Sequence, residues 1–241
     1  MLTVSIVIPA YNEEAFIATL LERVQQVPTE SIGYRQEIIV VDDGSKDATA
    51  EKVAAFPAVR LIRQANQGKG AAVQRGVKEA TGDFVLVQDA DLEYDPDDYM
   101  PLLAALQGDA NAAVYGSRIK GVIRDHGWHW PFPGKKPGQS IGPWGMNVLL
   151  SLVTFLLYGR WITDMLTGYK IYPRSFLNSI TVKTAGFETD HELSAKLFKK
   201  RYQVREVPVA YLPRSREEGK KITPLDGVKA IYVLFRFRFG D

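Results

Sequence analysis

Three acidic residues follow one short apolar stretch at alternate positions, and they are the clearest candidates for chemistry. Phe84–Val87 is an apolar run typical of a buried strand in a mostly parallel sheet. Asp89, Asp91 and Glu93 come next, and an extended backbone would place all three side chains on one face. Converging carboxylates suit a hard cation such as Mg²⁺ or Mn²⁺. The pattern therefore indicates a metal site, with a solvated acidic turn as the alternative.

The elements around these acids alternate between strands and helices. Strand-like apolar runs occur at Val4–Pro9, Ile38–Val41, Val59–Ile62, Phe84–Val87 and Ala112–Tyr115, with helical spacing between them. In the first helix, Asn12 is the predicted N-cap, and Phe16, Ile17, Leu20, Leu21 and Val24 form the buried stripe. This alternation predicts an α/β fold with a mostly parallel sheet and helices on both faces.

Ligands of such sheets bind beyond the carboxyl ends of the strands. These ends carry Pro9–Glu13, Asp42-Asp43, Asp89–Glu93 and Gly116–Arg118. Because four strand ends carry polar or charged groups, we expect one site along this edge.

The chain beyond Arg118 follows a different pattern. Ile119–Pro143 is rich in Gly, Pro and Trp and is predicted to be a long loop, which in compact domains is usually functional or disordered. Further elements are predicted as an apolar helix at Trp144–Tyr158, a turn and strand at Asp164–Tyr172, a helix at Phe187–Arg201, a strand at Val204–Leu212, a charged loop at Arg214–Lys221 and a helix around Leu225–Phe237.

A net charge of +2 hides a strong asymmetry between the two halves of the chain. Residues 1–118 hold 18 acidic and 10 basic residues, whereas residues 119–241 hold 10 acidic and 20 basic residues. The acidic half suits a cation, and the basic half suits an anionic partner such as phosphate, nucleic acid or a lipid surface. Solvated helix faces account for part of the charge.

The cysteine content and the hydropathy of the chain indicate its redox compartment and whether it can span a membrane. The chain has no Cys, which excludes disulfides and thiolate metal sites and fits a reducing compartment. Its longest apolar run, Val148–Tyr158, is shorter than the roughly 20 residues of a spanning helix. We therefore expect no membrane-spanning segment.

Two weaker motifs have alternative explanations. Gly68-Lys69-Gly70 opens a predicted helix, whose N-terminus can bind phosphate, but the spacing of a P-loop is absent and a simple turn is the alternative. Glu188 and Asp190 at another helix start can act as general bases or simply favour the helix dipole. Neither a Rossmann glycine motif nor a catalytic Ser/His/Asp set is evident.

Taken together, the motifs resemble those of the family-2 glycosyltransferases of GT-A fold. The segments that carry the resemblance are SIVIPAYNEE, IIVVDDGSKDAT, NQGKGAAVQRG, VQDADLEYDP, YGSR, TDMLTGYK, GFETDHELSAKLFKKRY and EVPVAYLPRSREEGKKI. The later segments are similar to the branch that contains dolichyl-phosphate mannose synthase and bacterial polyprenyl-phosphate glycosyltransferases. Two departures are a loop, Gly121–Pro143, that matches the family poorly, and the lack of the membrane-spanning helices that many relatives carry after this part.

The resemblance implies an inverting transfer from a nucleoside-diphosphate sugar with Mg²⁺ or Mn²⁺. Donor-binding positions implied by the matching motifs are Pro9, Ala10, Tyr11, Glu13, Asp43, Lys69, Asp89, Ala90 and Asp91. Asp89, Asp91 and Glu93 would contact the metal, while Ser117 and Arg118 would bind the acceptor phosphate. Asp91 and Arg118 are the implied catalytic pair. We expect a single GT-A domain over residues 1–241, with residues 1–118 binding donor and metal and residues 119–241 binding the acceptor.

The implied acceptor is a polyprenyl phosphate, either dolichyl or undecaprenyl. An anionic phosphate can attack without losing a proton, which fits the lack of an obvious base, and the basic half would cradle its charge. We expect a cytoplasmic, peripheral protein at a membrane surface or on a membrane-spanning partner, without nucleic acid. The main alternative is a soluble family-2 enzyme with a hydroxyl acceptor and Glu188 or Asp190 as base; the other is a non-catalytic nucleotide-sugar or nucleic-acid binder.

Overall fold

A computed structural model gives the fold of the chain and describes residues 1–129, 131–136, 140–212 and 224–240. The predicted charged loop Arg214–Lys221 therefore lies outside the described residues. Among these residues the strands are β1 (Leu2–Ala10), β2 (Tyr34–Asp42), β3 (Val59–Arg63), β4 (Phe84–Val87), β5 (Ala112–Ser117), β6 (Lys170–Pro173) and β7 (Gln203–Pro208). The helices are α1 (Ile17–Gln26), α2 (Thr49–Ala54), α3 (Lys69–Glu79), α4 (Tyr99–Leu106), α5 (Arg118–His126), α6 (Ile141–Tyr158), α7 (Arg174–Asn178), α8 (Thr189–Lys199) and α9 (Pro224–Phe239), with short 3₁₀ turns at Thr29–Ile32 and Pro96–Asp98.

The strands form one seven-stranded sheet in the order β3-β2-β1-β4-β6-β5-β7. All pairings are parallel except those of β6, which runs antiparallel to both β4 and β5. The predicted α/β class with a mostly parallel sheet is confirmed. Since β6 runs against its neighbours, its first residue, Lys170, lies at the edge where β4 and β5 end.

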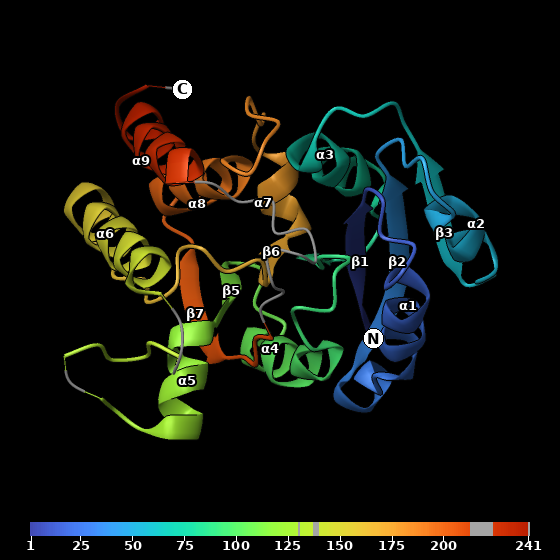
Figure 1. Cartoon of the computed structure of the whole chain (residues 1–241), viewed down its shortest axis with the longest axis horizontal. Helices are drawn as coiled ribbons and strands as arrows, with labels where there is room; N and C mark the ends of the chain where they lie inside the picture. The colour runs from blue at the N-terminus through green and yellow to red at the C-terminus, as the bar shows by residue number, and fades with distance from the viewer. Residues whose placement is uncertain (130, 137–139, 213–223, 241) are drawn as a thin grey trace.

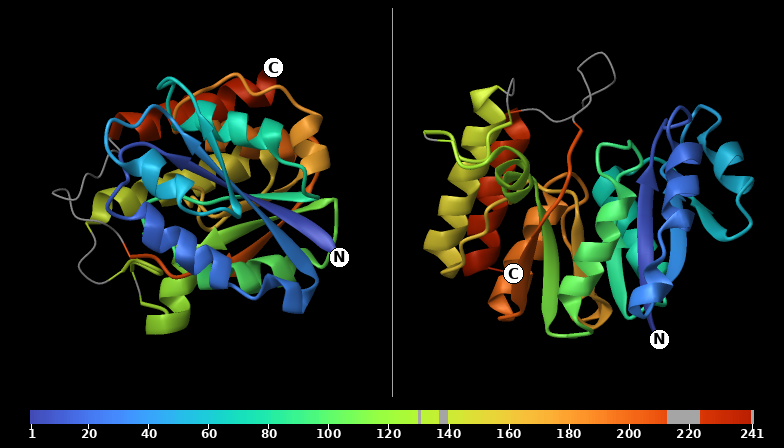
Figure 2. Two further views of the ribbon diagram at one scale, coloured as in Figure 1. Left: turned by 90° about the vertical axis from the view of Figure 1, so that its right-hand side faces the viewer. Right: turned by 90° about the horizontal axis from the view of Figure 1, so that it is seen from below.

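Helices cover both faces of the sheet, which gives three layers (Figures 1 and 2). One apolar core joins the sheet to α1, α2 and α4. It buries Ile17, Leu20, Leu21 and Val24 of the predicted stripe, whereas Phe16 precedes α1 and is only partly buried. The other core joins the opposite face to α3, α6, α7, α8 and α9. Figure 2 shows α6 and α9 side by side at the end of the molecule away from α1 and α2.

Two local predictions are wrong. Helix α1 begins only at Ile17, so Asn12 is not its N-cap. Instead, Asn12 has a positive φ of 55° and its side-chain oxygen accepts a hydrogen bond from the Lys46 amide at 2.8 Å. Asn tolerates this backbone conformation, so it ties together the loops that follow β1 and β2.

The predicted long loop Ile119–Pro143 contains a helix at its start. Helix α5 spans Arg118–His126, and the Ser117 hydroxyl caps it by accepting a hydrogen bond from the Lys120 amide at 3.1 Å. Ser117 is both the last residue of β5 and the N-cap of α5, so its motif indicates only a strand end. The Gly and Pro residues further along the segment favour a loop.

The expectation that no segment is long enough to span a membrane also needs correction. Helix α6 begins at Ile141 and has 18 residues with a mean hydropathy of 1.5, so by length and composition it can cross a bilayer. Only 22% of it is buried inside the protein. The apolar run Val148–Tyr158 is only the C-terminal part of this helix, whose first turns contain Gly, Pro and Asn.

Candidate active site

The acidic residues after β4 lie in a turn, residues 89–93, which we call the acid turn. Its backbone is not extended, and Leu92 has a positive φ of 57°. The prediction that an extended chain aligns the three carboxylates is therefore wrong. Among the described residues, no group of three or more Asp, Glu, His or Cys side chains is arranged to hold a metal ion. Ala90, between the first two acids, is buried in the core.

Each outer acid of the turn contacts a different partner. Asp89 forms an ion pair with the Lys69 ammonium, with 2.6 Å between Oδ1 and Nζ. The Tyr211 hydroxyl donates a hydrogen bond to Glu93 Oε2 at 2.7 Å. Between them, Asp91 Oδ1 accepts a weak bond from the Glu93 amide at 3.2 Å. The turn thus presents Asp91 between two anchored carboxylates.

Lys69 is the first residue of α3 and extends toward the acid turn. Burial by itself lowers the pKa of its ammonium, but the carboxylates of Asp89, Asp190 and Asp91 outweigh this effect and raise the pKa. Lys69 therefore stays charged and lies among three acids. The start of α3 packs closely against the residues before and at the start of α8, because a Cβ on Gly70 would lie 2.2 Å from Thr189 Oγ1 and 2.6 Å from the Ala185 carbonyl oxygen.

The predicted donor residues of β1 and β2 fix the loops along the same edge. The buried Asp43 carboxylate accepts hydrogen bonds from the amides of Gln67 and Gly68 at 3.0 and 2.8 Å, and so positions the start of α3. The Ala10 carbonyl accepts a bond from the Asp43 amide at 2.9 Å. The Glu13 amide donates to Thr49 Oγ1 at 2.9 Å. Pro9 and Tyr11, partly exposed, flank this loop.

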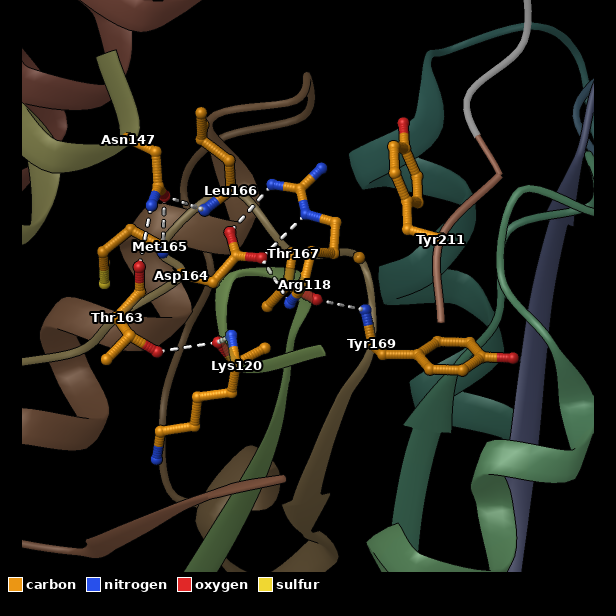
Figure 3. Close-up of polar contacts among 12 residues, drawn as sticks. Arg118, Lys120, Asn147, Thr163, Asp164, Met165, Leu166, Thr167, Tyr169 and Tyr211 are labelled. Carbon is orange, nitrogen blue, oxygen red and sulfur yellow. Dashed lines mark hydrogen bonds and ion pairs between the residues drawn. The ribbon is translucent and has the colours of Figure 1, made fainter. Parts of the chain in front are cut away.

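Arg118 lies at the end of β5 and is held by a carboxylate that the sequence reading did not single out. Asp164, which is 1% exposed, accepts hydrogen bonds from the Arg118 Nε and Nη2 atoms at 2.7 and 2.8 Å and from its backbone amide at 2.9 Å (Figure 3). Burial alone would lower the pKa of the guanidinium, but Asp164 raises it. Among the described residues, these bonds leave Nη1 without a protein partner.

The loop that carries Asp164 is held from two sides, and Figure 3 shows Asn147 on one of them. Asn147, buried on the inner side of α6, donates to the Thr163 carbonyl at 2.8 Å and accepts a bond from the Met165 amide at 2.9 Å. Glu206 of β7 accepts bonds from the amide and hydroxyl of Thr163 at 2.8 and 2.6 Å. Neither residue was identified from the sequence; the only signal was the motif TDMLTGYK that contains Asp164.

The other predicted residues are distributed unevenly around the site. Ser117 is fully buried, and its hydroxyl is bonded to the Thr163 hydroxyl at 2.7 Å as well as capping α5, so it supports Arg118 from below. Glu188 is at the N-cap position of α8 without capping it through its side chain. Asp190, in the first turn of α8, lies close enough to Lys69 to act on its pKa. Of the two candidate bases, Asp190 is thus one that lies within electrostatic range of Lys69.

Comparisons with known proteins identify the family of the chain. The sequence model of glycosyl transferase family 2 matches residues 5–180, and the chain belongs to this family. It is similar to a dolichol-phosphate mannosyltransferase of Pyrococcus furiosus, with 31% identity over 90% of this chain and 58% of the relative. It is also similar to a UDP-N-acetylglucosamine–dolichyl-phosphate N-acetylglucosaminyltransferase of Methanococcus voltae, with 26% identity over 98% of this chain and 96% of the relative.

Other curated relatives are longer than this chain. The chain spans 58% of the Pyrococcus protein and 51% of a low-salt glycan biosynthesis hexosyltransferase of Haloferax volcanii, to which it is 29% identical over 92% of its own length. Among solved structures, it superposes on a glucosyl-3-phosphoglycerate synthase of Mycobacterium tuberculosis in complex with Mn²⁺, UDP-glucose and phosphoglyceric acid. The TM-score is 0.70 at 20% identity, over 100% of this chain and 81% of that chain, which supports the fold.

The pair between the half-buried Arg118 and the buried Asp164 predicts a large loss of stability when the carboxylate charge is removed. Asp164→Asn leaves the guanidinium without a counter-charge, which should lower the free energy of unfolding by about 3–5 kcal/mol. Urea unfolding followed by circular dichroism measures the difference. The control is Asp125→Asn, because Asp125 pairs with Arg124 at an exposed position and such pairs contribute at most about 1 kcal/mol. Equal losses in the two variants would contradict a special role for Asp164.

Proposed function

We propose that the protein is an inverting glycosyltransferase that moves a sugar from a nucleoside-diphosphate sugar to a polyprenyl phosphate, dolichyl or undecaprenyl. The observation that carries the proposal is that two sites of opposite charge lie next to each other at one edge of the sheet. The acid turn suits a cation and a diphosphate, and Arg118 suits a phosphate anion. Tyr211 contacts both Glu93 and Arg118, so the two sites are one side chain apart.

The names of the relatives support this acceptor class. Two of them transfer sugars to dolichol or dolichyl phosphate, and an undecaprenyl-phosphate 4-deoxy-4-formamido-L-arabinose transferase of Pseudomonas paraeruginosa is 40% identical over 53% of this chain. All three names describe a polyprenyl-phosphate substrate. For this chain we propose the same acceptor class and leave the sugar and the nucleotide base open.

The donor set fits a divalent ion that is completed by its substrate. Magnesium and similar ions are commonly held by one or two carboxylates together with phosphate oxygens. Asp91 and Asp89 would provide these carboxylates and Glu93 is the third candidate ligand, with Mg²⁺ or Mn²⁺ as the ion. When bound, such an ion neutralises the charge that develops on the leaving diphosphate. Lys69, charged and paired with Asp89, would add a second positive group beside the same diphosphate.

The residues of the chain divide the chemistry between donor and acceptor. Pro9, Ala10, Tyr11, Glu13 and Asp43 line the loops where the nucleoside would bind. Arg118, supported by Ser117 and Asp164, would hold the acceptor phosphate so that one oxygen faces the anomeric carbon opposite the diphosphate. Since this oxygen is already an anion, no base has to remove a proton. Attack from the opposite face inverts the configuration at that carbon.

The lipid acceptor requires contact with a membrane surface, and the structure offers an apolar face for it. Helices α6 and α9 expose large apolar side chains that form what we call the outer face: Ile141, Val148, Leu149, Leu152, Phe155, Leu156, Leu225, Val228, Tyr232, Phe235 and Phe239. A patch of this kind on a water-soluble surface usually marks an interaction site. Arg236 and Arg238 of α9 would favour anionic lipids. We propose peripheral attachment of this face at the cytoplasmic side of a membrane or to a membrane-spanning partner.

The metal assignment predicts the effect of removing one ligand. Asp91→Asn should lower the transfer rate by about 100-fold or more and weaken donor binding, because a charged ligand of the ion is lost. Transfer and Mn²⁺-dependent donor binding are measured in the variant and in the wild type, with EDTA as the second condition. Asp97→Asn, in the exposed turn before α4, is the matched control. Full activity in excess EDTA would reject the metal.

The acceptor assignment predicts which substitutions stop the chemistry. Arg118→Ala should lower transfer to a short polyprenyl phosphate by roughly 30- to 4,000-fold, because the loss of such a charged contact costs about 2–5 kcal/mol. Glu188→Gln and Asp190→Asn should have much smaller effects. Arg124→Ala, on the exposed end of α5, controls for loss of a positive charge.

Two further checks make the comparison decisive. Arg118→Lys keeps a charge beside Asp164, and urea unfolding of every variant identifies losses that come from misfolding. An active Arg118→Ala variant, together with an inactive Glu188→Gln or Asp190→Asn variant, would instead indicate a hydroxyl acceptor with a carboxylate base.

The outer face predicts binding to anionic liposomes that weakens as salt increases. Replacing the exposed Leu156 and Tyr232 by Glu should abolish flotation with vesicles that contain phosphatidylglycerol, without loss of stability, because both side chains are more than 60% exposed. The control adds two negative charges at Gln25 and Gln26 on α1, at the far end of the sheet (Figure 1). No flotation of the wild type at low salt would reject membrane docking.

A further inference from the structure

Tyr211 follows β7 at the place where the chain passes between the acid turn and Arg118. Its backbone forms an antiparallel bridge with Tyr94, and the next amide, of Leu212, donates to the Glu93 carbonyl at 2.8 Å. Two residues earlier, the Val209 amide donates to the Ser117 carbonyl at 3.2 Å. The short segment 209–212 is therefore bonded to the acid turn at one end and to the residue before Arg118 at the other.

The side chain of Tyr211 also joins the acid turn to Arg118. Its hydroxyl donates to Glu93 Oε2 at 2.7 Å, and its ring lies over the guanidinium with 4.9 Å between the ring centroid and Arg118 Cζ (Figure 3). The ring also packs against Tyr94, with 5.1 Å between centroids. Tyr94 in turn accepts a hydrogen bond from the Gly168 amide at 2.8 Å and is buried. Tyr211 thus has a rigid support on its third side.

The hydroxyl of Tyr211 contacts a proposed metal ligand, Glu93, and its ring contacts the proposed acceptor-binding residue, Arg118. The hydroxyl orients a carboxylate of the acid turn, and the ring face stabilises a cation, for which aromatic faces are suited. Asp164 accepts bonds from one edge of the same guanidinium while the ring lies over its face, so a carboxylate and a ring both hold Arg118. A displacement of Glu93 toward a bound ion would therefore act on Tyr211 and through it on Arg118.

We infer that Tyr211 is a positioning residue that couples the cation-binding acid turn to Arg118, so that occupation of the donor side strengthens binding of an acceptor phosphate. The inference rests on the proposed function for the identity of the two ligands. Coupling of this kind is reciprocal, and it typically changes affinity by about 5- to 150-fold. A side chain that only filled space would change the stability of the fold but would leave this ratio intact.

The test measures binding rather than turnover. The acceptor probe is geranyl phosphate, and the donor-side probe is Mn²⁺ with pyrophosphate, which needs no knowledge of the nucleotide. Isothermal titration gives the affinity for geranyl phosphate with and without Mn²⁺-pyrophosphate, and the ratio is the coupling. We expect a ratio on the order of 10 for the wild type.

Two substitutions separate the two ends of the side chain. Tyr211→Phe keeps the ring and loses the bond to Glu93, so the ratio should fall to about 1–3 while affinity for geranyl phosphate alone stays within about 2-fold. Tyr211→Leu also removes the ring from Arg118, so this affinity should fall by about 2- to 30-fold as well. Tyr202→Phe, which loses a hydroxyl at the other end of β7, should match the wild type.

The outcomes distinguish this inference from the proposed function. If both probes bind the wild type and the ratio is unchanged in Tyr211→Phe and Tyr211→Leu, the coupling role is wrong and the proposed function stands. A wild-type ratio near 1 also overturns the inference. If geranyl phosphate does not bind the wild type at all, the proposed acceptor and the coupling role fall together. Urea unfolding of each variant shows whether a lost ratio reflects lost structure.

Discussion

The ion pair between Arg118 and Asp164 is the constraint on which the segments around the carboxyl end of β5 depend. A guanidinium that is largely removed from water is costly unless a carboxylate satisfies it with good geometry, and the buried Asp164 does so through both of its oxygens. Asp164 comes from a loop 46 residues further along the chain. That loop has to be held in place, and Asn147 of α6 and Glu206 of β7 both bond to it. One buried charge therefore ties together β5, α6, β7 and the loop before β6.

On the other side of β6, the acid turn brings several negative charges together, and these need a positive partner. Lys69 compensates them from the start of α3, and the loop before α3 is fixed by the buried Asp43. The strand order places β6 between β4 and β5, so the acid turn and Arg118 are separated by the width of one strand. The turn before β6 packs closely on the acid turn, since a Cβ on Gly168 would lie 2.7 Å from Asp89 Oδ2. The acid turn and Arg118 are thus brought side by side without direct pairing of their charges.

Helix α6 connects this site to the surface of the molecule. Its inner side carries Asn147, which holds the loop of Asp164, and its outer side exposes Leu152 and Leu156. The C-terminal ends of α6 and α9 are joined by a bond from the Tyr158 hydroxyl to the Leu234 carbonyl at 2.7 Å. Helix α6 therefore joins the exposed outer face to the loop that holds Asp164 beside Arg118.

Most of the residues at the carboxyl ends of the strands could be predicted from the sequence, because the patterns that mark them are local. Apolar runs that end in Asp43, Asp89 or Arg118 mark both the strands and their carboxyl ends, and a parallel sheet has to collect those ends at one edge. The strand order, the antiparallel β6 and the partner of Arg118 were not predictable in this way, because they depend on contacts between residues far apart in the chain. The turn conformation at Asp91 was decided by tertiary contacts as well: Lys69 holds Asp89, Tyr211 holds Glu93, and an alternating pattern of acids alone cannot distinguish this turn from an extended strand. The sequence by itself thus determined which groups reach the edge of the sheet, whereas only the packing of distant segments decided how their charges are paired.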